Sequence, residues 1–116
     1  NRLNAAGIPY TMKNMATLEE PREMYLACNL YVVASRQEGG PQALLEAPAT
    51  RTPIITTDMG IARQVISESC IVDVSCDLYS PSEEDVELNY TNVLKYNIED
   101  YGNVYMNYFK EVLENV

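Results

Sequence analysis

The sequence contains no histidine, and it lacks several motifs that would mark a class of enzyme. Without histidine, imidazole-based acid–base catalysis and the usual zinc sites are excluded. Neither a P-loop nor a Gly-x-Gly-x-x-Gly turn is present, and Ser35 lacks the Gly-x-Ser-x-Gly frame of a hydrolase nucleophile. No ligand set for a metal is visible, so we predict a protein that needs neither a metal ion nor another cofactor.

A long apolar run and a basic face are also missing. No run approaches the roughly 18 apolar residues of a membrane span, so no transmembrane segment is expected. The net charge is −9, and residues 67–116 carry eleven acids against only Lys95 and Lys110. Nucleic-acid binding is therefore disfavoured, because no basic face exists to displace counterions. The acidic half is most simply a solvated helical surface.

With 116 residues, the chain is one domain or part of one, and we treat residues 1–116 as a single domain. It begins without an initiating Met or a signal peptide, which suggests a piece of a longer protein. Cys28, Cys70 and Cys76 are odd in number and form no Cys-x-x-Cys pair, so we expect buried thiols in a reducing cytosol. A cytoplasmic location follows, with peripheral membrane attachment of the longer protein left open.

Strand and helix signals alternate along the chain. Thr17 is a plausible helix N-cap, with Glu20 three positions on, and either Ser80 or Ser82 caps a later helix. Strands are expected at residues 8–12, 30–34, 53–57 and 70–74, and helices at 19–28, from Pro41 onward, and at 60–66, about 82–96 and 100–116. This order predicts an α/β fold, a Rossmann-like parallel sheet with helices on both faces.

The most informative segment is Ser35–Ala47, a strand end followed by a glycine turn and a helix start. Ligands of open parallel sheets bind beyond the carboxyl ends of the strands, where this turn lies. Gly39 and Gly40 allow close backbone approach, and the first helical turn offers N–H groups to an anion. Glu38 on the turn and Glu46 on the helix can accept bonds from hydroxyls on either side. This arrangement suits a sugar joined to a nucleotide diphosphate.

The spacing of the two glutamates is not informative by itself. Among twelve glutamates, roughly one pair eight residues apart is expected by chance, and either residue could be an ordinary surface charge. The context gives the pair its weight. A buried strand, Glu-Gly-Gly-Pro, Leu-Leu-Glu-Ala, a proline-led strand and Thr-Asp-Met-Gly follow one another in order.

In this context the chain resembles the retaining glycosyltransferases of family 4, which have the GT-B fold. The resemblance is tight over residues 24–66 and looser at 70–74, and residues 81–116 share only a general helical character. The matching segments are Cys28–Pro41, Leu44–Ala47 and Thr52–Ile61. The resemblance implies that the chain is part of the donor-binding, carboxyl-terminal domain of a hexosyltransferase that uses a nucleotide-diphosphate sugar.

The resemblance also implies roles for individual residues. The first glutamate of the motif contacts the donor sugar, and the second binds the ribose of the nucleotide. The assignments are Glu38 for catalysis at the donor sugar, Gly39, Gly40, Gln42 and Leu45 for the sugar and diphosphate, Glu46 for the ribose, and Lys13 and Met15 beside the base.

Besides Asn29, which replaces a frequent Asp, two positions near the end of the helix that carries Glu46 depart from the family pattern. Pro48 replaces a frequent Met, and Arg51 a frequent Gly. Proline lacks an N–H and clashes with the carbonyl four residues earlier, so the helix should bend or stop early. An early stop would remove the need for a glycine at the helix end.

Two strand–helix units of the family domain are missing, together with the basic pair that they carry and the acceptor-binding amino-terminal domain. Arg36 and Arg63 are candidate substitute cations, although solvated or structural roles are favoured. Without a cation, two carboxylates beside a diphosphate are unfavourable. We therefore expect the isolated chain to bind donor weakly and to be inactive.

Two functions remain open. The first is a retaining glycosyltransferase acting on a glycan, lipid or other acceptor that a further domain would bind. The second is a non-catalytic α/β interaction or scaffold module derived from the same fold. Tyr101, Tyr105 and Tyr108 recur at helical spacing, which favours core or domain-packing roles over a sugar platform.

Overall fold

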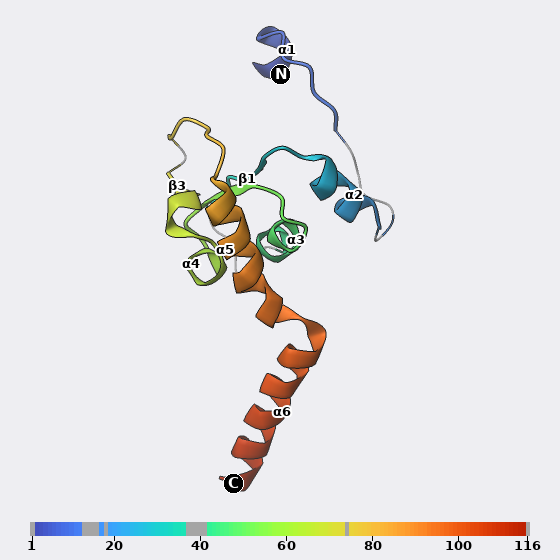
Figure 1. The fold of residues 1–116 in the computed structure, drawn as a ribbon, viewed down its shortest axis with the longest axis vertical. Helices are drawn as coiled ribbons and strands as arrows, with labels where there is room; N and C mark the ends of the chain where they lie inside the picture. Colours follow the sequence, from blue (N-terminus) through green and yellow to red (C-terminus); the bar gives the residue numbers. More distant parts are fainter. Residues whose placement is uncertain (1, 13–16, 18, 37–41, 74, 116) are drawn as a thin grey trace.

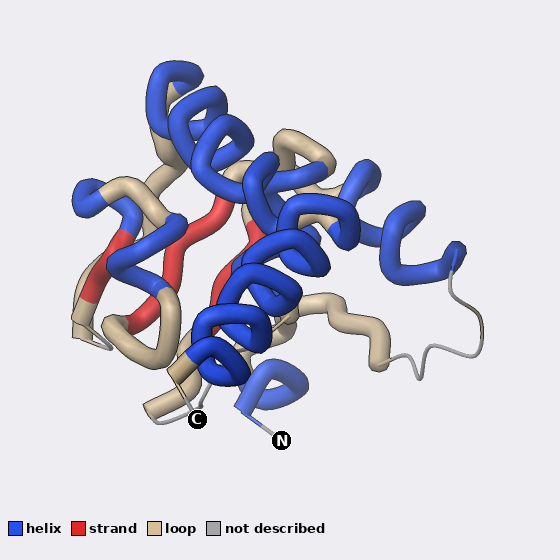
Figure 2. The backbone as a smooth tube through the Cα atoms, turned by 90° about the horizontal axis from the view of Figure 1, so that it is seen from below, coloured by secondary structure: helices blue, strands red, loops and turns tan. Residues whose placement is uncertain are grey.

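The computed structural model describes residues 2–12, 17, 19–36, 42–73 and 75–115. In this part of the chain, three parallel strands form one sheet in the order β1-β2-β3, with Tyr31 opposite Ile54 and Thr56 opposite Ile71 (Figures 1 and 2). The strands are β1 (Tyr31–Val33), β2 (Ile54–Thr57) and β3 (Ile71–Val72). The predicted α/β fold, a Rossmann-like parallel sheet flanked by helices, is confirmed.

Helices connect and follow the strands. The α-helices are α1 (Arg2–Ala5), α2 (Glu19–Ala27), α3 (Ala43–Ala49), α4 (Ala62–Val65), α5 (Glu83–Val93) and α6 (Ile98–Glu114), and the 3₁₀ turns are η1 (Glu68–Cys70) and η2 (Leu94–Tyr96). The core lies between β2 and the helices, with Leu44, Ile54 and Val65 fully buried in it. Helix α3 lies between α2 and α5 (Figure 1).

The described helices pack against one face of the sheet, not both. The strands lie in the sheet in the order of the sequence, and connections between parallel strands are almost always right-handed. The connecting helices α3 and α4 therefore lie on the same side of the sheet. The opposite face has a cavity of about 130 Å³, lined by strand residues and by Asp73, Cys76 and Leu78. Val32 on this face is 43% exposed, so the expectation of helices on both faces of the sheet is wrong for the described residues.

The strand predicted at residues 8–12 does not form. This segment is irregular, and the side chains of Ile8, Tyr10 and Met12 are exposed. A strand is stable only beside a partner that supplies its ladder hydrogen bonds. None of the described strands lies beside this segment, which explains why its local strand signal was insufficient.

The cysteine prediction holds for one residue. Cys70 is buried in the core, and burial raises the pKa of its thiol. Cys28 is half-buried and Cys76 is exposed on the segment after β3, so they correct the expectation of three buried thiols.

The predicted N-caps are present. Thr17 Oγ1 accepts from the Glu20 N–H at 3.3 Å, and Ser82 Oγ accepts from the Asp85 N–H at 3.1 Å. Pairs of this kind satisfy N–H groups that a helix start leaves without a partner. They explain why α2 and α5 begin within a residue or two of the predicted positions.

Asp85 should make the stability of the chain depend on pH. Its carboxylate accepts from the hydroxyls of Ser69 (2.7 Å), Ser67 (2.8 Å) and Ser82 (2.9 Å), and the first two bonds are the main cause of a pKa below the ordinary 3.8. A lowered folded-state pKa stabilises the fold above the unfolded value, and this contribution is lost as pH falls through the folded value. We expect Asp85→Asn to lower the free energy of unfolding near neutral pH, with a gap from wild type that narrows below pH 3.8. Urea unfolding of both proteins at several pH values would measure this difference in the free energy of unfolding. A difference that does not change with pH would contradict the lowered pKa of Asp85.

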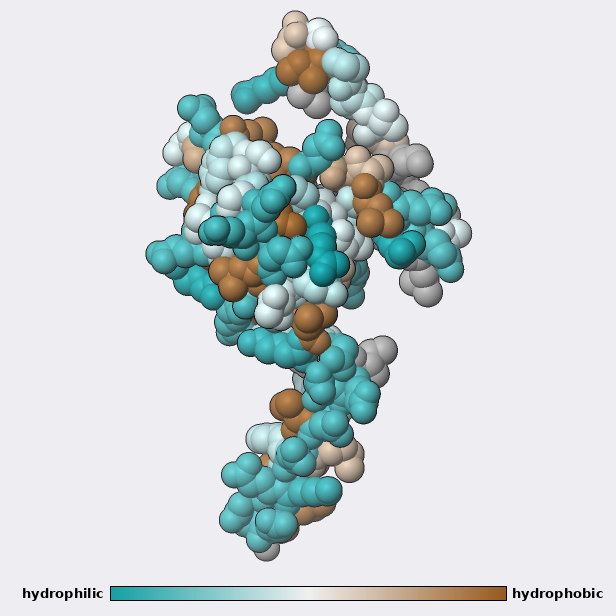
Figure 3. All heavy atoms as spheres, in the orientation of Figure 1, coloured by the Kyte–Doolittle hydropathy of each residue, from teal (hydrophilic) through white to brown (hydrophobic). Residues whose placement is uncertain are grey.

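Helix α6 projects away from the body and gives the chain an elongated shape of 62 × 32 × 27 Å (Figure 1). The radius of gyration is 17.1 Å, whereas a compact domain of this length has about 13 Å. Apolar residues lie on the surface of α6 among hydrophilic ones (Figure 3). Tyr105 and Tyr108 are 53% and 59% exposed, which excludes a core role for them and leaves the domain-packing interpretation untested.

Candidate functional site

The described part of the predicted site is built on helix α3. Leu44 and Ala47 are fully buried and fix the inner face of this helix in the core. Gln42 is its N-cap residue, and the N–H groups of Leu45 and Glu46 both donate to the Gln42 carbonyl at 2.9 Å. Among the described residues, Leu45 is therefore the first whose N–H donates to a carbonyl of the same helix. The N–H groups before it have no acceptor within the helix, as at any helix start.

Gln42 and Glu46 are four residues apart and share the outer face of the helix. They line a hollow of about 590 Å³ between α2 and α3, together with Pro21, Arg22, Tyr25, Ala49 and Thr50. This size falls within the range of about 300–1,000 Å³ that is typical of small-molecule sites. The hollow combines a carboxylate, an amide, hydroxyls and a guanidinium, which suits a ligand with several hydroxyls and a negative charge.

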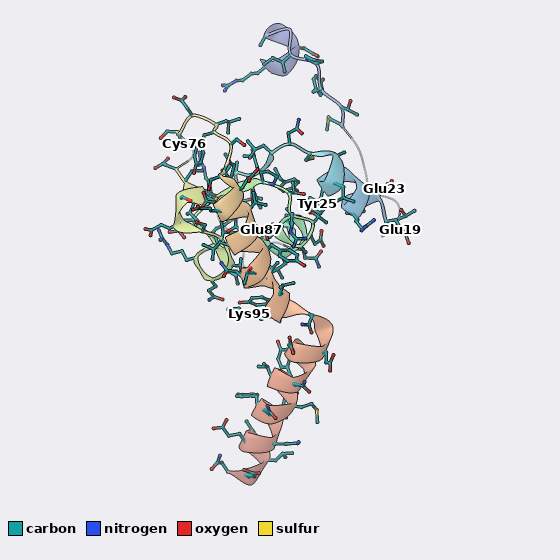
Figure 4. The ribbon with its side chains drawn as sticks, in the orientation of Figure 1. Glu19, Glu23, Tyr25, Cys76, Glu87 and Lys95 are labelled. Carbon is teal, nitrogen blue, oxygen red and sulfur yellow. The ribbon has the colours of Figure 1, made fainter. Side chains whose placement is uncertain are left out.

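Glu46 has a fixed partner in this hollow. The phenol O–H of Tyr25 donates to Glu46 Oε2 at 3.0 Å. Figure 4 shows Tyr25 on the side of α2 that faces α3, whereas Glu19 and Glu23 lie on the far side. Tyr25 is only 5% exposed, and burial, followed by the bond to Glu46, raises the pKa of its phenol well above the ordinary value. Tyr25 therefore stays a neutral donor.

Two residues of this hollow, Tyr25 and Arg22, lie outside the predicted site. A buried tyrosine usually finds a partner for its O–H, and Arg22 lies three residues before it on the same helical face. Of the two cations that were considered, Arg63 pairs with Asp58 at 2.9 Å, and Arg36 is exposed.

The other predicted site residues divide into two groups. Leu45 is half-buried and lines a separate hollow of about 340 Å³ between α3 and α5. Its N–H already donates to the Gln42 carbonyl, so a phosphate bound there would share this N–H with that carbonyl. Glu38, Gly39, Gly40, Lys13 and Met15 lie outside the described residues. The structure therefore brings together Gln42 and Glu46, and the positions of those five residues relative to them stay predictions.

The end of α3 corrects one expectation from the family pattern. The helix continues through Pro48 to Ala49, and Arg51, at the position where the family pattern has glycine, adopts the left-handed conformation, with φ of 54°. The Thr52 N–H donates to the Ala47 carbonyl at 3.0 Å, and the Arg51 N–H to Pro48 at 2.9 Å, which is a Schellman motif. This motif needs positive φ at the position of Arg51. The helix therefore ends where the family's glycine would end it, and the expectation of an early stop at Pro48 is wrong.

The Arg51 side chain makes two contacts with helix α5. Arg51 Nε lies 2.9 Å from Glu87 Oε1, and its guanidinium stacks 3.7 Å from the centre of the Tyr90 ring. Each contact is worth about 1 kcal/mol or less at an exposed site, which is comparable to the cost of left-handed backbone in a residue with a side chain.

We expect Arg51→Ala to lower the free energy of unfolding by about 1 kcal/mol, because both contacts are lost and the backbone strain stays. Arg51→Gly loses the same contacts but relieves the strain, so it should be more stable than the alanine variant by about 1 kcal/mol. Equilibrium urea unfolding of both variants measures the difference. An alanine variant as stable as the glycine variant would contradict the left-handed assignment.

A family model described as "Glycosyl transferases group 1" matches residues 10–71. The chain belongs to this family. The match spans α2, β1, α3, β2, α4 and η1 and all the predicted site residues, whereas α5 and α6 lie beyond it. No curated protein and no solved structure gave a significant match.

Two further properties of the described residues bear on this glycosyltransferase domain. None of their helices is long and apolar enough to span a membrane. No group of three or more cysteine, aspartate or glutamate side chains lies close enough in this part of the chain to hold a metal ion. Metal independence itself stays a prediction.

Proposed function

We propose that this group 1 glycosyltransferase chain is part of the donor-binding domain of a retaining, GT-B-type enzyme. The enzyme would transfer a hexose from a nucleotide-diphosphate sugar to an acceptor that a further domain of the protein binds. The single observation that carries this proposal is the placement of Gln42 and Glu46 on one wall of the hollow between α2 and α3. In sequence, this helix begins three residues after Glu38-Gly39-Gly40, which lie outside the described residues.

Each residue has a proposed role. Glu46 accepts hydrogen bonds from the two hydroxyls of the ribose, because an ionised carboxylate is an acceptor with capacity for several donors. The backbone at Gly39, Gly40, Gln42 and Leu45 holds the sugar and diphosphate. Glu38 orients the donor sugar, and Lys13 and Met15 lie beside the base.

The chemistry of the transfer follows from these roles. As the bond between the sugar and the β-phosphate breaks, negative charge develops on the leaving diphosphate. Preorganised N–H groups of the α3 start stabilise that charge, and the glutamates keep the sugar in a reactive orientation. A hydroxyl of the acceptor attacks the anomeric carbon from the face that the diphosphate leaves and gives its proton to the departing phosphate, which retains the configuration at that carbon. Arg22, on the wall of the hollow, supplies a positive charge that offsets the two carboxylates.

Titration of the chain and of any longer parent protein with UDP-glucose, GDP-mannose and ADP-glucose tests the proposal. Saturation-transfer NMR suits the weak binding expected of the isolated chain. Saturable binding of at least one donor is expected, and binding of none by either protein would contradict the donor-site assignment.

A non-catalytic interaction module is the second candidate, and the exposed apolar residues of α6 favour it. Val104, Phe109 and Leu113 are 54–74% exposed. Exposed apolar residues gathered on one element are typical of surfaces that bind another protein or domain. This function predicts association through α6 without nucleotide-sugar binding, so the same titration separates the two candidates.

A further inference from the structure

The hydrogen bond between Tyr25 and Glu46 joins the two walls of the hollow. The donor comes from α2 and the acceptor from α3, 21 residues apart in sequence, with 3.0 Å between the oxygens. Glu46 is exposed, and a long exposed side chain would otherwise sample several rotamers. The bond selects one of them.

Tyr25 is itself held by several contacts. Its ring packs edge-on against Tyr31 with 5.1 Å between the centroids, and its carbonyl accepts from the Thr52 hydroxyl at 2.7 Å. Only 5% of the residue is exposed. The phenol oxygen therefore has little freedom to move, and it offers Glu46 a fixed donor.

The bond to Tyr25 leaves Glu46 able to bind a ligand. An ionised carboxylate has two oxygens and about four lone-pair positions, so one donated bond does not saturate it. A vicinal diol carries two adjacent O–H donors that can reach the remaining positions. A diol binds more tightly when the carboxylate is oriented before binding, because the glutamate side chain then loses less conformational freedom.

We infer that Tyr25 is a positioning residue for nucleotide recognition, whose phenol O–H holds the Glu46 carboxylate in the orientation that accepts the ribose 2′- and 3′-hydroxyls. The inference rests on the proposed function, since it takes the ribose as the ligand of Glu46. It goes beyond that function in assigning selectivity for ribose over 2′-deoxyribose to a residue that does not itself contact the nucleotide.

Tyr25→Phe in the full chain removes the hydroxyl and keeps the ring. We expect affinity for the best-bound nucleotide of a UDP, GDP and ADP panel to fall about 3- to 10-fold, the effect of having to immobilise one flexible side chain on binding. Affinity for the matching 2′-deoxynucleotide should change less, so ribose selectivity should fall. Tyr90→Phe, which removes a phenol from the other side of α3, serves as the matched control and should bind like wild type.

A double-mutant cycle separates positioning from a general effect on folding. In a Glu46→Ala background, Tyr25→Phe should have no further effect on nucleotide affinity, because the group that it positions is absent. Equal losses in both backgrounds would overturn the inference and indicate a structural role. Wild-type binding with no loss in Tyr25→Phe would also overturn it while leaving the proposed function intact. Wild type that binds no nucleotide of the panel would remove the proposed function and the inference together.

Discussion

Glu46→Ala is expected to weaken the binding of a nucleotide-diphosphate sugar by about 10- to 100-fold, because hydrogen bonds to a charged group contribute about 1.5–3 kcal/mol. The carboxylate lies on the wall of the hollow between α2 and α3, and its loss removes the acceptor for two ribose hydroxyls. Isothermal titration, or ligand-observed NMR where binding is weak, measures the change.

Two further variants make this result interpretable. Glu46→Ala leaves the buried phenol of Tyr25 without its acceptor, which itself costs about 1–3 kcal/mol of stability. Glu46→Gln keeps a neutral acceptor of the same shape, so it separates the loss of charge from the loss of the Tyr25 contact. Glu84→Ala removes an equal charge from the exposed first turn of α5 and should not change the affinity. Unchanged affinity in both Glu46 variants would remove the ribose assignment.

Leu44→Ala should have the largest effect on stability, with a loss of about 2–5 kcal/mol in the free energy of unfolding. Leu44 is fully buried and lies in the core between the sheet and the helices. Truncation leaves a cavity that the surrounding side chains fill only in part. Since domains of this size are stable by about 5–15 kcal/mol, the variant should unfold at clearly lower urea concentration.

The control for this prediction lies on α6. Leu113 is 74% exposed, so Leu113→Ala should change the free energy of unfolding by no more than about 0.5 kcal/mol. Leu44→Ala should also reduce donor binding, because Leu44 fixes the helix that carries Gln42 and Glu46. A Leu44 variant as stable as wild type would contradict the placement of α3 in the core.

Local features of the fold could be predicted from the sequence because their causes are local. Thr17 and Ser82 cap helices through N–H groups three residues away. The β2 segment is a run of β-branched residues, two isoleucines and two threonines, after a proline, and all four are buried. Within the site, Glu-Gly-Gly-Pro followed by Leu-Leu-Glu-Ala predicted a helix that carries Glu46, and the structure has that helix at Ala43–Ala49, beginning two residues after the predicted start at Pro41.

The remaining features depend on residues that are distant in sequence. Residues 8–12 carry a strand signal but have no partner among the described strands, and the exposure of Val32 depends on which face the connections cover. Arg51 keeps a glycine-like conformation because the Schellman motif requires it, whichever residue occupies the position. The partner of the Tyr25 hydroxyl lies on another helix, so periodicity within α2 could not reveal it.

The most direct test of the donor site is a map of backbone amide NMR shifts of the chain during titration with a nucleotide-diphosphate sugar. We predict saturable shifts at the start of α3, at Gln42, Ala43 and Leu44, with no comparable shifts at the first turn of α5, residues 83–85. Shifts confined to other elements, with the α3 start unchanged at saturation, would contradict the assignment of this helix start to the donor diphosphate.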